Sequence, residues 1–146
     1  MRIGIVLSPE GGALKQMLPP FRLGLGGKIG SGRQYWSWIS LPDLVRSLLF
    51  AVETEELSGP VNAVAPNAVS NTEFTRVLGR VLRRPTLFPL QGFVARLVLG
   101  EMADELLLSS IRVEPEQLQK HGFEFEHPHL ETALRAVLHR ELPSQK

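Results

Sequence analysis

Short apolar segments alternate with helical patterns along the first 85 residues of the chain. Residues 2–7, 35–39 and 61–65 are short, apolar and bounded by glycine, proline or serine, which is typical of strands. The segments between and after them place apolar residues three and four positions apart, as on one face of a helix. This alternation predicts an α/β fold for about residues 1–85.

Three helices are predicted in this region, each with its own boundary signals. The first covers residues 13–18 and is expected to stop at Pro19-Pro20. The second begins near Pro42, which suits a first helical turn, and carries Asp43 in that turn. The third opens with the capping box Ser70-Asn-Thr-Glu73. The second and third each carry an apolar stripe, made of Leu44, Val45, Leu48, Leu49 and Val52 in one and of Phe74, Val77, Leu78, Val81 and Leu82 in the other.

The rest of the chain is predicted to be mainly helical. Helical patterns cover residues 90–99, 101–109, 115–120 and 130–138. Gly122 stands where a glycine commonly follows a helix, and residues 123–125 suggest an edge strand. The chain is therefore divided into an α/β part over residues 1–88, a small mostly helical domain over residues 89–142, and a tail over residues 143–146.

Composition narrows the classes of function. The 146 residues are 43% hydrophobic and 21% charged, and a net charge of +1 gives no electrostatic case for nucleic acid or an anionic membrane as partner. No apolar run reaches the roughly 18 to 20 residues that a membrane span needs. The absence of cysteine excludes disulfides and thiolate zinc sites and fits a cytoplasmic protein. The histidines gathered near the end lack the spacing of a metal site, so no metal is predicted.

Two motifs that would carry nucleotide-cofactor chemistry are absent. The fingerprint G-x-G-x-x-G starts at Gly24 and again at Gly30, but its third glycine position holds Ile29 in one case and Tyr35 in the other. The chain has one tyrosine, and Ile39 stands four residues after it, so no Tyr-x-x-x-Lys acid–base pair is present. No catalytic residue is therefore assigned in this chain.

A series of short motifs nevertheless runs through most of the chain. In the first part they are Gly11-Gly-Ala-Leu-x-x-Met17, Pro20-Phe-Arg-Leu-Gly-Leu-Gly-Gly27, Ile29-Gly-Ser-Gly-Arg-Gln34 and Trp36-Ser-Trp-Ile39. Further along they are Asp43-Leu-Val45, Gly59-Pro-Val-Asn62, Ala65-Pro-Asn67, Arg84-Pro85, Gly100-Glu-Met-Ala103 and Gly122-Phe-Glu-Phe125. Over about residues 2–139 this series resembles an atypical family of extended short-chain dehydrogenases, described as NAD-dependent epimerases or nucleoside-diphosphate-sugar epimerase-like proteins. Residues 90–140 resemble the small C-terminal domain of unknown function of that family.

The resemblance implies a partial Rossmann-type fold and a missing half. Family members begin with a Rossmann unit that bears the glycine fingerprint and then the Tyr-x-x-x-Lys pair, so this chain is expected to start near the sixth strand. NAD or NADP is the implied cofactor of the full-length protein, and a small polar molecule such as a nucleotide sugar is the implied substrate. The missing N-terminal Rossmann half is the expected partner, and a homodimer is a further expectation.

The resemblance also implies site residues. Arg2 matches an arginine close to the nicotinamide end of the cofactor. Arg33, Gln34 and Trp38 match the segment that lies against the substrate's phosphate or sugar in extended relatives. A guanidinium fork suits a phosphate, and an indole face suits stacking on a sugar or base. The family usually has histidine where this chain has Ser40, so any role of that histidine is changed here.

Two functions remain open on the sequence alone. In the first, the chain is the substrate-binding half of an NAD(P)-dependent epimerase or oxidoreductase and is not catalytic by itself. In the second, it is a non-catalytic module that self-associates or binds a protein partner. The second follows because a sheet cut between strands exposes unpaired backbone and an apolar face.

Overall fold

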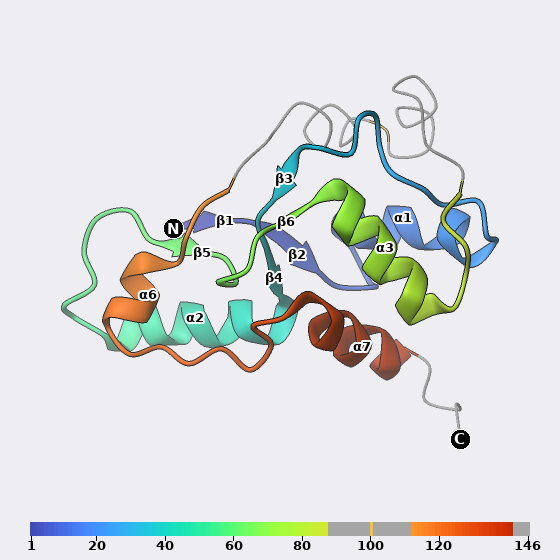
Figure 1. Ribbon diagram of the computed structural model, residues 1–146. Helices are drawn as coiled ribbons and strands as arrows, with labels where there is room; N and C mark the ends of the chain where they lie inside the picture. The colour runs from blue at the N-terminus through green and yellow to red at the C-terminus, as the bar shows by residue number, and fades with distance from the viewer. Residues whose placement is uncertain (88–99, 101–111, 142–146) are drawn as a thin grey trace.

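The computed structural model describes residues 1–87, 100 and 112–141 and shows short strands flanked by helices (Figure 1). The strands are β1 (Arg2–Ile3), β2 (Ile5–Leu7), β3 (Tyr35–Trp36), β4 (Trp38–Ser40), β5 (Asn62–Ala63) and β6 (Val69–Ser70). The helices are α1 (Gly12–Arg22), α2 (Leu41–Glu53), α3 (Asn71–Leu82), α6 (Glu116–Lys120) and α7 (Leu130–Glu141). The fold is therefore mixed α/β, as predicted.

The strands pair in three short ladders, two of them parallel. β1 pairs with β5 and β2 with β4 in parallel, whereas β3 and β6 are antiparallel. The strand predicted over residues 2–7 divides at Gly4, because the chain changes partner there from the Ala63 carbonyl to the Ser37 carbonyl. A Cβ at Gly4 would lie 2.5 Å from the Ser37 carbonyl oxygen, so this close crossing requires glycine. The strand predicted over residues 35–39 divides at Ser37 into β3 and β4.

The expected stop of the first helix at Pro19-Pro20 is wrong, because α1 continues to Arg22. Each proline lacks an amide donor, which weakens the last turns of the helix. Burial of the next residue offsets this loss: Phe21 is 1% exposed, and a Cβ on Gly26 would lie 2.6 Å from its ring. Full burial of such a side chain contributes about 2 kcal/mol. Tertiary packing thus overrides the local signal.

The third helix, α3, begins and ends as its sequence predicts. Ser70 Oγ accepts a hydrogen bond from the Glu73 amide at 3.2 Å, which is one of the two bonds expected of a capping box. Arg83 ends the helix in a left-handed conformation, with φ of 57°. The apolar face is buried: Leu78 is fully covered, and the Phe74 ring meets Trp36 edge to face at 5.0 Å between centroids.

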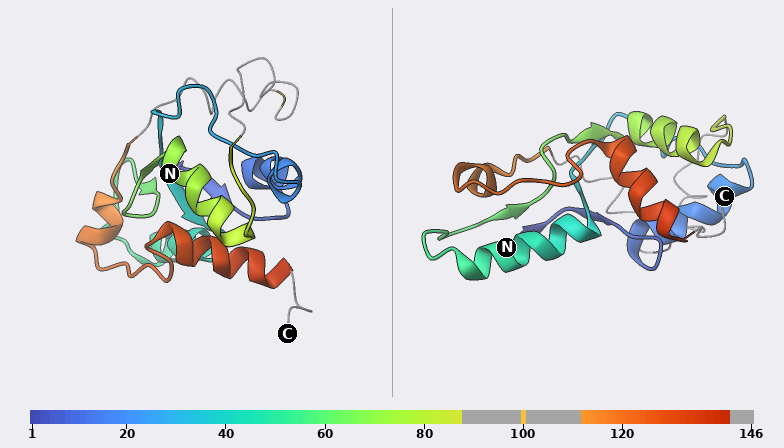
Figure 2. Two further views of the ribbon diagram at one scale, coloured as in Figure 1. Left: turned by 45° about the vertical axis from the view of Figure 1, so that its right-hand side comes forward. Right: turned by 90° about the horizontal axis from the view of Figure 1, so that it is seen from below.

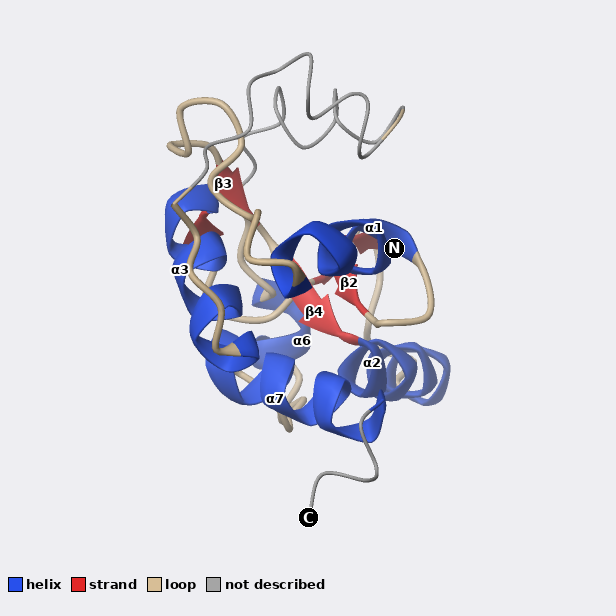
Figure 3. Ribbon diagram, turned by 90° about the vertical axis from the view of Figure 1, so that its right-hand side faces the viewer, coloured by secondary structure: helices blue, strands red, loops and turns tan. Residues whose placement is uncertain are grey.

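The last helix, α7, confirms the helix predicted over residues 130–138 and packs beside α3 (Figure 3). Its apolar residues join those of α1, α3 and β2 in a single core. They are Leu130, Ala133, Leu134, Val137 and Leu138. The predicted domain boundary near residue 88 stays a prediction, but the core of the first part includes this late helix.

A second, smaller apolar cluster lies around α6 and β5. Its buried members are Val61, Leu118 and Phe123. Phe123 meets Phe50 and Phe125 edge to face, with centroids 5.3 and 4.9 Å away. The edge strand predicted over residues 123–125 is wrong, because the segment pairs with none of the described strands and instead places its aromatic rings in this cluster. The short helix before it is confirmed, and Gly122 has the positive φ expected of it, 89°.

The helices predicted over residues 90–99 and 101–109 and the tail over residues 143–146 lie outside the described residues. Among the residues that the structure describes, no helix has the length and apolar character required to cross a membrane.

Candidate functional site

The carboxyl ends of β2 and β4 meet at the same edge, because the two strands are parallel. β2 leads into the turn at residues 8–11, and β4 leads directly into α2. An open cavity of about 520 Å³ lies here, with Ser8, Glu10, Arg46 and Glu126 as its polar members. Its apolar members are Leu7, Pro9, Leu41, Pro42, Val45 and Val137. Ligands of open α/β sheets bind outside the carboxyl ends of the strands, so this cavity is the candidate site.

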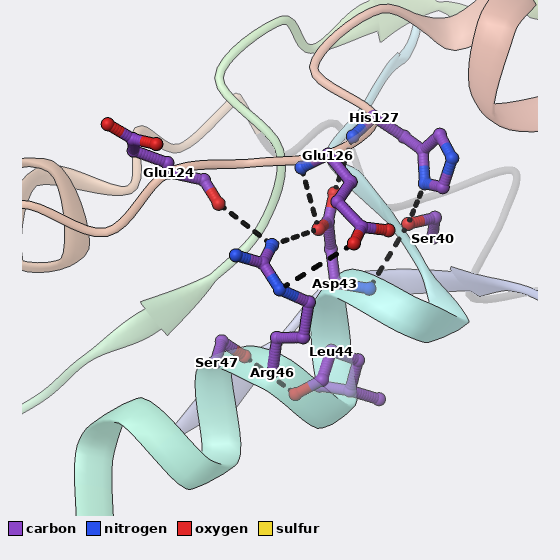
Figure 4. A network of polar contacts seen from close by, with 8 residues as sticks. All are labelled: Ser40, Asp43, Leu44, Arg46, Ser47, Glu124, Glu126 and His127. Carbon is purple, nitrogen blue, oxygen red and sulfur yellow. Dashed lines mark hydrogen bonds and ion pairs between the residues drawn. The ribbon is translucent and has the colours of Figure 1, made fainter. Parts of the chain in front are cut away.

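Asp43 is the centre of a buried polar network beside the cavity (Figure 4). Its side chain is completely buried. One carboxylate oxygen accepts hydrogen bonds from the Arg46 guanidinium and from the Glu126 amide, both at 2.9 Å. The other oxygen accepts one from the His127 amide at 2.9 Å. These three donors satisfy a carboxylate that burial would otherwise penalise, and they hold the segment 124–127 against the first turn of α2.

Arg46 links the network to the cavity wall. Its guanidinium also donates to the Glu124 carbonyl at 2.8 Å and lies 5.0 Å over the ring of Phe123. Its Nε is 3.9 Å from the Glu126 carboxylate, which is itself exposed. The cavity therefore presents a guanidinium whose orientation is fixed by several partners.

Ser40 caps α2 and contacts a histidine from a distant part of the chain. Its hydroxyl accepts a hydrogen bond from the Asp43 amide at 3.3 Å and lies 3.2 Å from Nδ1 of His127. Ser40 is completely buried. An imidazole that lies 87 positions later in the chain thus reaches the serine that caps α2.

Asp43, Glu126 and His127 also bring three potential metal-ligand atoms within 4.8 Å of one another. The Asp43 oxygens already accept three N–H bonds, and Nδ1 of His127 lies against Ser40. A cation would compete with donors that point at the same oxygens. The arrangement therefore favours a structural network over a metal centre.

Arg33 and Gln34 lie on the glycine-containing loop that precedes β3. Arg33 is exposed, and its amide donates to Ser31 Oγ at 3.2 Å. Gln34 is buried, and its side-chain amide donates to the Ile29 carbonyl at 3.1 Å. Gln34 thus holds the shape of the loop, whereas the Arg33 side chain is open to solvent.

Trp38 and Arg2 both lie in strands, but Trp38 is buried and Arg2 is exposed. Trp38 is completely buried within the apolar core, and its ring N–H donates to the Asn67 carbonyl at 2.8 Å. Its ring presents no free face for stacking in this structure. Arg2 is exposed in β1, and its amide donates to the Val61 carbonyl at 2.7 Å. The residues that line the cavity do not include Arg2, Arg33, Gln34 or Trp38, whose ligand-binding roles stay predictions.

The Asp43 network is the part of the site that sequence reasoning missed. The sequence indicates a first-turn helix residue, which Asp43 is, but its amide partners lie 83 and 84 positions later. One signal was available in the sequence: Asp43 and Ser47 stand four residues apart on the helix face opposite to the aliphatic residues, so two polar side chains share that face. In the structure both are completely buried.

The chain is similar to known proteins along most of its length. Residues 92–137 match the family model of the domain of unknown function DUF1731. An epimerase family protein of Mycobacterium bovis is 50% identical over 133 residues, which are 91% of this chain and 44% of the relative. The human epimerase family protein SDR39U1 is 40% identical over 138 residues, or 94% of this chain and 47% of the relative. The chain thus spans about half the length of these relatives.

Solved structures place the chain in the same group. A crystal structure of human SDR39U1 with NADPH superposes with a TM-score of 0.85 at 40% identity, over 93% of this chain and 46% of that one. UDP-glucose 4-epimerase of Thermus thermophilus in complex with NAD gives a TM-score of 0.65 at 16% identity, over 96% of this chain and 45% of that one, which shows a shared fold alone. Over about half the length of its relatives, the chain therefore belongs to the epimerase family of extended short-chain dehydrogenases that includes SDR39U1 and carries the DUF1731 domain.

Proposed function

We propose that the chain is the substrate-side half of an NADP(H)-dependent epimerase or oxidoreductase that acts on a small polar or sugar-nucleotide-like substrate. The observation that carries the proposal is the 40%-identical human relative, whose structure contains NADPH. The cavity at the carboxyl ends of β2 and β4 supports it, because this is where an α/β sheet of this kind binds its ligands.

The cavity residues of this chain suit the nicotinamide end of such a cofactor, but not its pyrophosphate. The cavity offers the Ser8 hydroxyl, the oriented Arg46 guanidinium and an apolar wall, which suit a neutral ring and a nearby polar substrate. The glycine fingerprint that would hold a pyrophosphate is absent from the 146 residues. A cofactor would therefore be held mainly by another part of the protein, with this chain closing the side toward the substrate.

The chemistry proposed for the complete protein is removal of a hydroxyl proton with transfer of hydride. The bound nicotinamide supplies the hydride acceptor. The Tyr-x-x-x-Lys pair is absent from the 146 residues, so the proposal assigns the acceptor of the hydroxyl proton to another part of the protein. Within the chain, Arg33 would bind a substrate phosphate from its exposed loop, and Gln34 would hold that loop in place. Trp38 would act from within the core, where its ring N–H donates to the Asn67 carbonyl, and Arg2 stays the proposed residue near the nicotinamide.

The test is cofactor binding by a complete protein. The part of the Mycobacterium bovis relative that this chain does not match would be joined ahead of Met1, and NADPH and NADH would be titrated calorimetrically. We expect saturable binding with a preference for NADPH. No binding of either nucleotide by a folded protein would overturn the proposal.

The second candidate function, a module that self-associates or binds a protein partner, is favoured by a different observation. The aliphatic residues of α2 are exposed rather than packed in the core. Light scattering over a range of concentrations tests it, since self-association would raise the mass with concentration. A monomer at high concentration counts against self-association.

A further inference from the structure

The loop that carries Arg33 is fastened to the first turn of α3. It covers residues 28–34, is called the Arg33 loop, and passes over the start of α3 on its way from α1 to β3 (Figure 1 and the left view of Figure 2). The side-chain oxygen of Asn71 accepts the Ile29 amide at 2.7 Å, and the Asn71 amide donates to the Gln34 carbonyl at 2.8 Å. One residue of α3 thus holds both ends of the loop.

Thr72, the next residue of α3, fixes the middle of the loop. Its amide and its hydroxyl both donate to the Gly32 carbonyl, at 2.9 and 2.8 Å. Gly32 has a φ of 73°, and a Cβ at this position would collide with the Thr72 hydroxyl oxygen. Any larger residue would therefore strain the backbone and push the loop away from α3. The shape of the loop is set by its contact with the helix.

This shape brings a second cation next to Arg33. A Cβ on Gly32 would lie 3.2 Å from Cβ and 3.0 Å from Cδ of Lys28, so the lysine stem packs over the residue that precedes Arg33. Lys28 and Arg33 are both exposed, and no carboxylate of the described residues forms an ion pair with either. The Ser31 hydroxyl accepts the Arg33 amide, which leaves its own hydrogen available to a ligand. The loop therefore presents donors of positive charge without an acidic partner in the described structure.

A phosphate group is the ligand that such a loop suits. Two cations on neighbouring positions repel each other, and an anion between them removes that repulsion. Phosphate oxygens accept hydrogen bonds from an ammonium group and from a guanidinium fork at the same time. A neutral sugar or base would gain little from the second charge. Because the loop is already held in shape by α3, binding does not incur the full entropic cost of ordering it.

We propose that Lys28 is a second phosphate-binding residue beside Arg33, and that Asn71 and Thr72 are positioning residues that hold the Arg33 loop so that both cations face one ligand. The inference rests on the proposed function, to which it adds that the substrate carries a phosphate or diphosphate group at this loop. Lys28 determines specificity for the charged group, whereas the two residues of α3 act through the loop and touch no substrate.

The first experiment titrates this chain with inorganic pyrophosphate in a calorimeter at low salt. We expect saturable binding that Lys28→Ala and Arg33→Ala each weaken about tenfold, because each removes a charged hydrogen-bond donor. Lys120→Ala is the matched control, since it removes the same charge from an exposed position on α6, and it should change the affinity by no more than about twofold. A parent chain that does not bind pyrophosphate overturns the site. An unchanged affinity in Lys28→Ala, or an equal loss in Lys120→Ala, overturns the role of Lys28.

The second experiment separates positioning from general stability. Thr72→Val removes the hydroxyl without removing a charge, and Thr72→Ser keeps it. We expect Thr72→Val to weaken pyrophosphate binding about fivefold and Thr72→Ser to bind as the parent does. Amide hydrogen exchange should become faster at Gly32, whose amide donates within the loop to Ile29, and stay unchanged at Ile5, whose amide donates to Ser37.

Asn71→Ala tests the other anchor in the same way, and it should speed exchange at the Ile29 amide, again without an effect at Ile5. An unchanged affinity for pyrophosphate in both Thr72→Val and Asn71→Ala overturns the positioning role. Faster exchange at Ile5 in both variants overturns it as well, because the residues would then stabilise the whole fold and not the loop.

A titration of the joined protein with NADPH distinguishes a phosphate of the substrate from a phosphate of the cofactor. We expect Lys28→Ala to leave the affinity for NADPH unchanged. A weaker affinity would assign the loop to the cofactor and overturn the inference. A joined protein that binds pyrophosphate through Lys28 but binds neither NADPH nor NADH supports the phosphate site and overturns the proposed function, so the two failures are distinct.

Discussion

The helices α2 and α3 have the same kind of sequence pattern and opposite placements. Both are amphipathic, both begin at a serine cap, and both carry an acidic residue in the first turn. In α3 the apolar face is buried, with Leu78 fully covered. In α2 the buried residues are Asp43 and Ser47, whereas Leu49 is 57% exposed. An amphipathic pattern therefore predicts that a face will be covered, but it does not identify what covers it.

The largest expected effect comes from the buried helix. Leu78→Ala removes a fully covered side chain from the core shared by α3 and α7, and we expect a loss of about 3 to 4 kcal/mol in the free energy of unfolding. Urea denaturation followed by circular dichroism measures it. A loss below about 1 kcal/mol would mean that α3 is not packed as described.

The next effect concerns the inward face of α2. Asp43→Asn keeps the size of the side chain but removes the charge that faces Arg46 and replaces an acceptor oxygen with a donor. We expect a loss of about 3 kcal/mol in the free energy of unfolding. Ser47→Ala is the control, because that hydroxyl donates only within the helix, to Leu44, and should cost about 1 kcal/mol. Equal losses in the two variants would show that the Asp43 network stabilises the fold no more than one ordinary hydrogen bond does.

A smaller, pH-dependent effect is expected where α3 meets α7. Hydrogen bonds from Arg135 and Arg80 lower the pKa of Glu131 below its usual value. Because the folded-state pKa is the lower one, the ion pairs stabilise the fold above the unfolded pKa, and this contribution is lost as the pH falls through the folded pKa. Glu131→Gln should therefore be slightly less stable than the parent at neutral pH and equally stable in acid. Urea midpoints at both pH values measure this, and high salt should shrink the difference.

The smallest expected effect, that of a substitution on the exposed face of α2, tests the difference between α2 and α3 most directly. Leu49→Ala makes the same change on α2 as Leu78→Ala makes on α3, yet the isolated chain should change in stability by no more than about 0.5 kcal/mol. Urea denaturation under the same conditions decides. A loss as large as that of Leu78→Ala would show that the aliphatic face of α2 around Leu49 is already covered within this chain.

The parts of the fold that could be predicted are those that local sequence determines. The serine cap of α3 and the glycine after α6 follow from neighbouring residues, and both are confirmed. The continuation of α1 through Pro19 and Pro20 could not be predicted, because it depends on burial of Phe21 among residues from other elements. The end of α1 is therefore set by tertiary packing, which outweighs the local preference of proline to stop a helix.

The candidate site was less accessible to prediction than the fold. Motifs pointed to Arg33, Gln34 and Trp38, but spacing alone could not reveal that Trp38 is fully buried or that Gln34 holds the Ile29 carbonyl. The contact between Asp43 and the amide of His127 joins positions 84 residues apart, which no periodic pattern encodes. Such long-range polar contacts become visible only once the chain is folded.

The place of α7 in the core has a consequence for how the chain is made. Leu134, 0% exposed, completes an apolar core that also contains Leu7 and Leu14 from the first elements of the chain. On the ribosome, Leu7 and Leu14 emerge well before Leu134, and they lack this partner until α7 is synthesised. Until then, the apolar faces of α1 and α3 that share this core with α7 are the surfaces that a chaperone would shield.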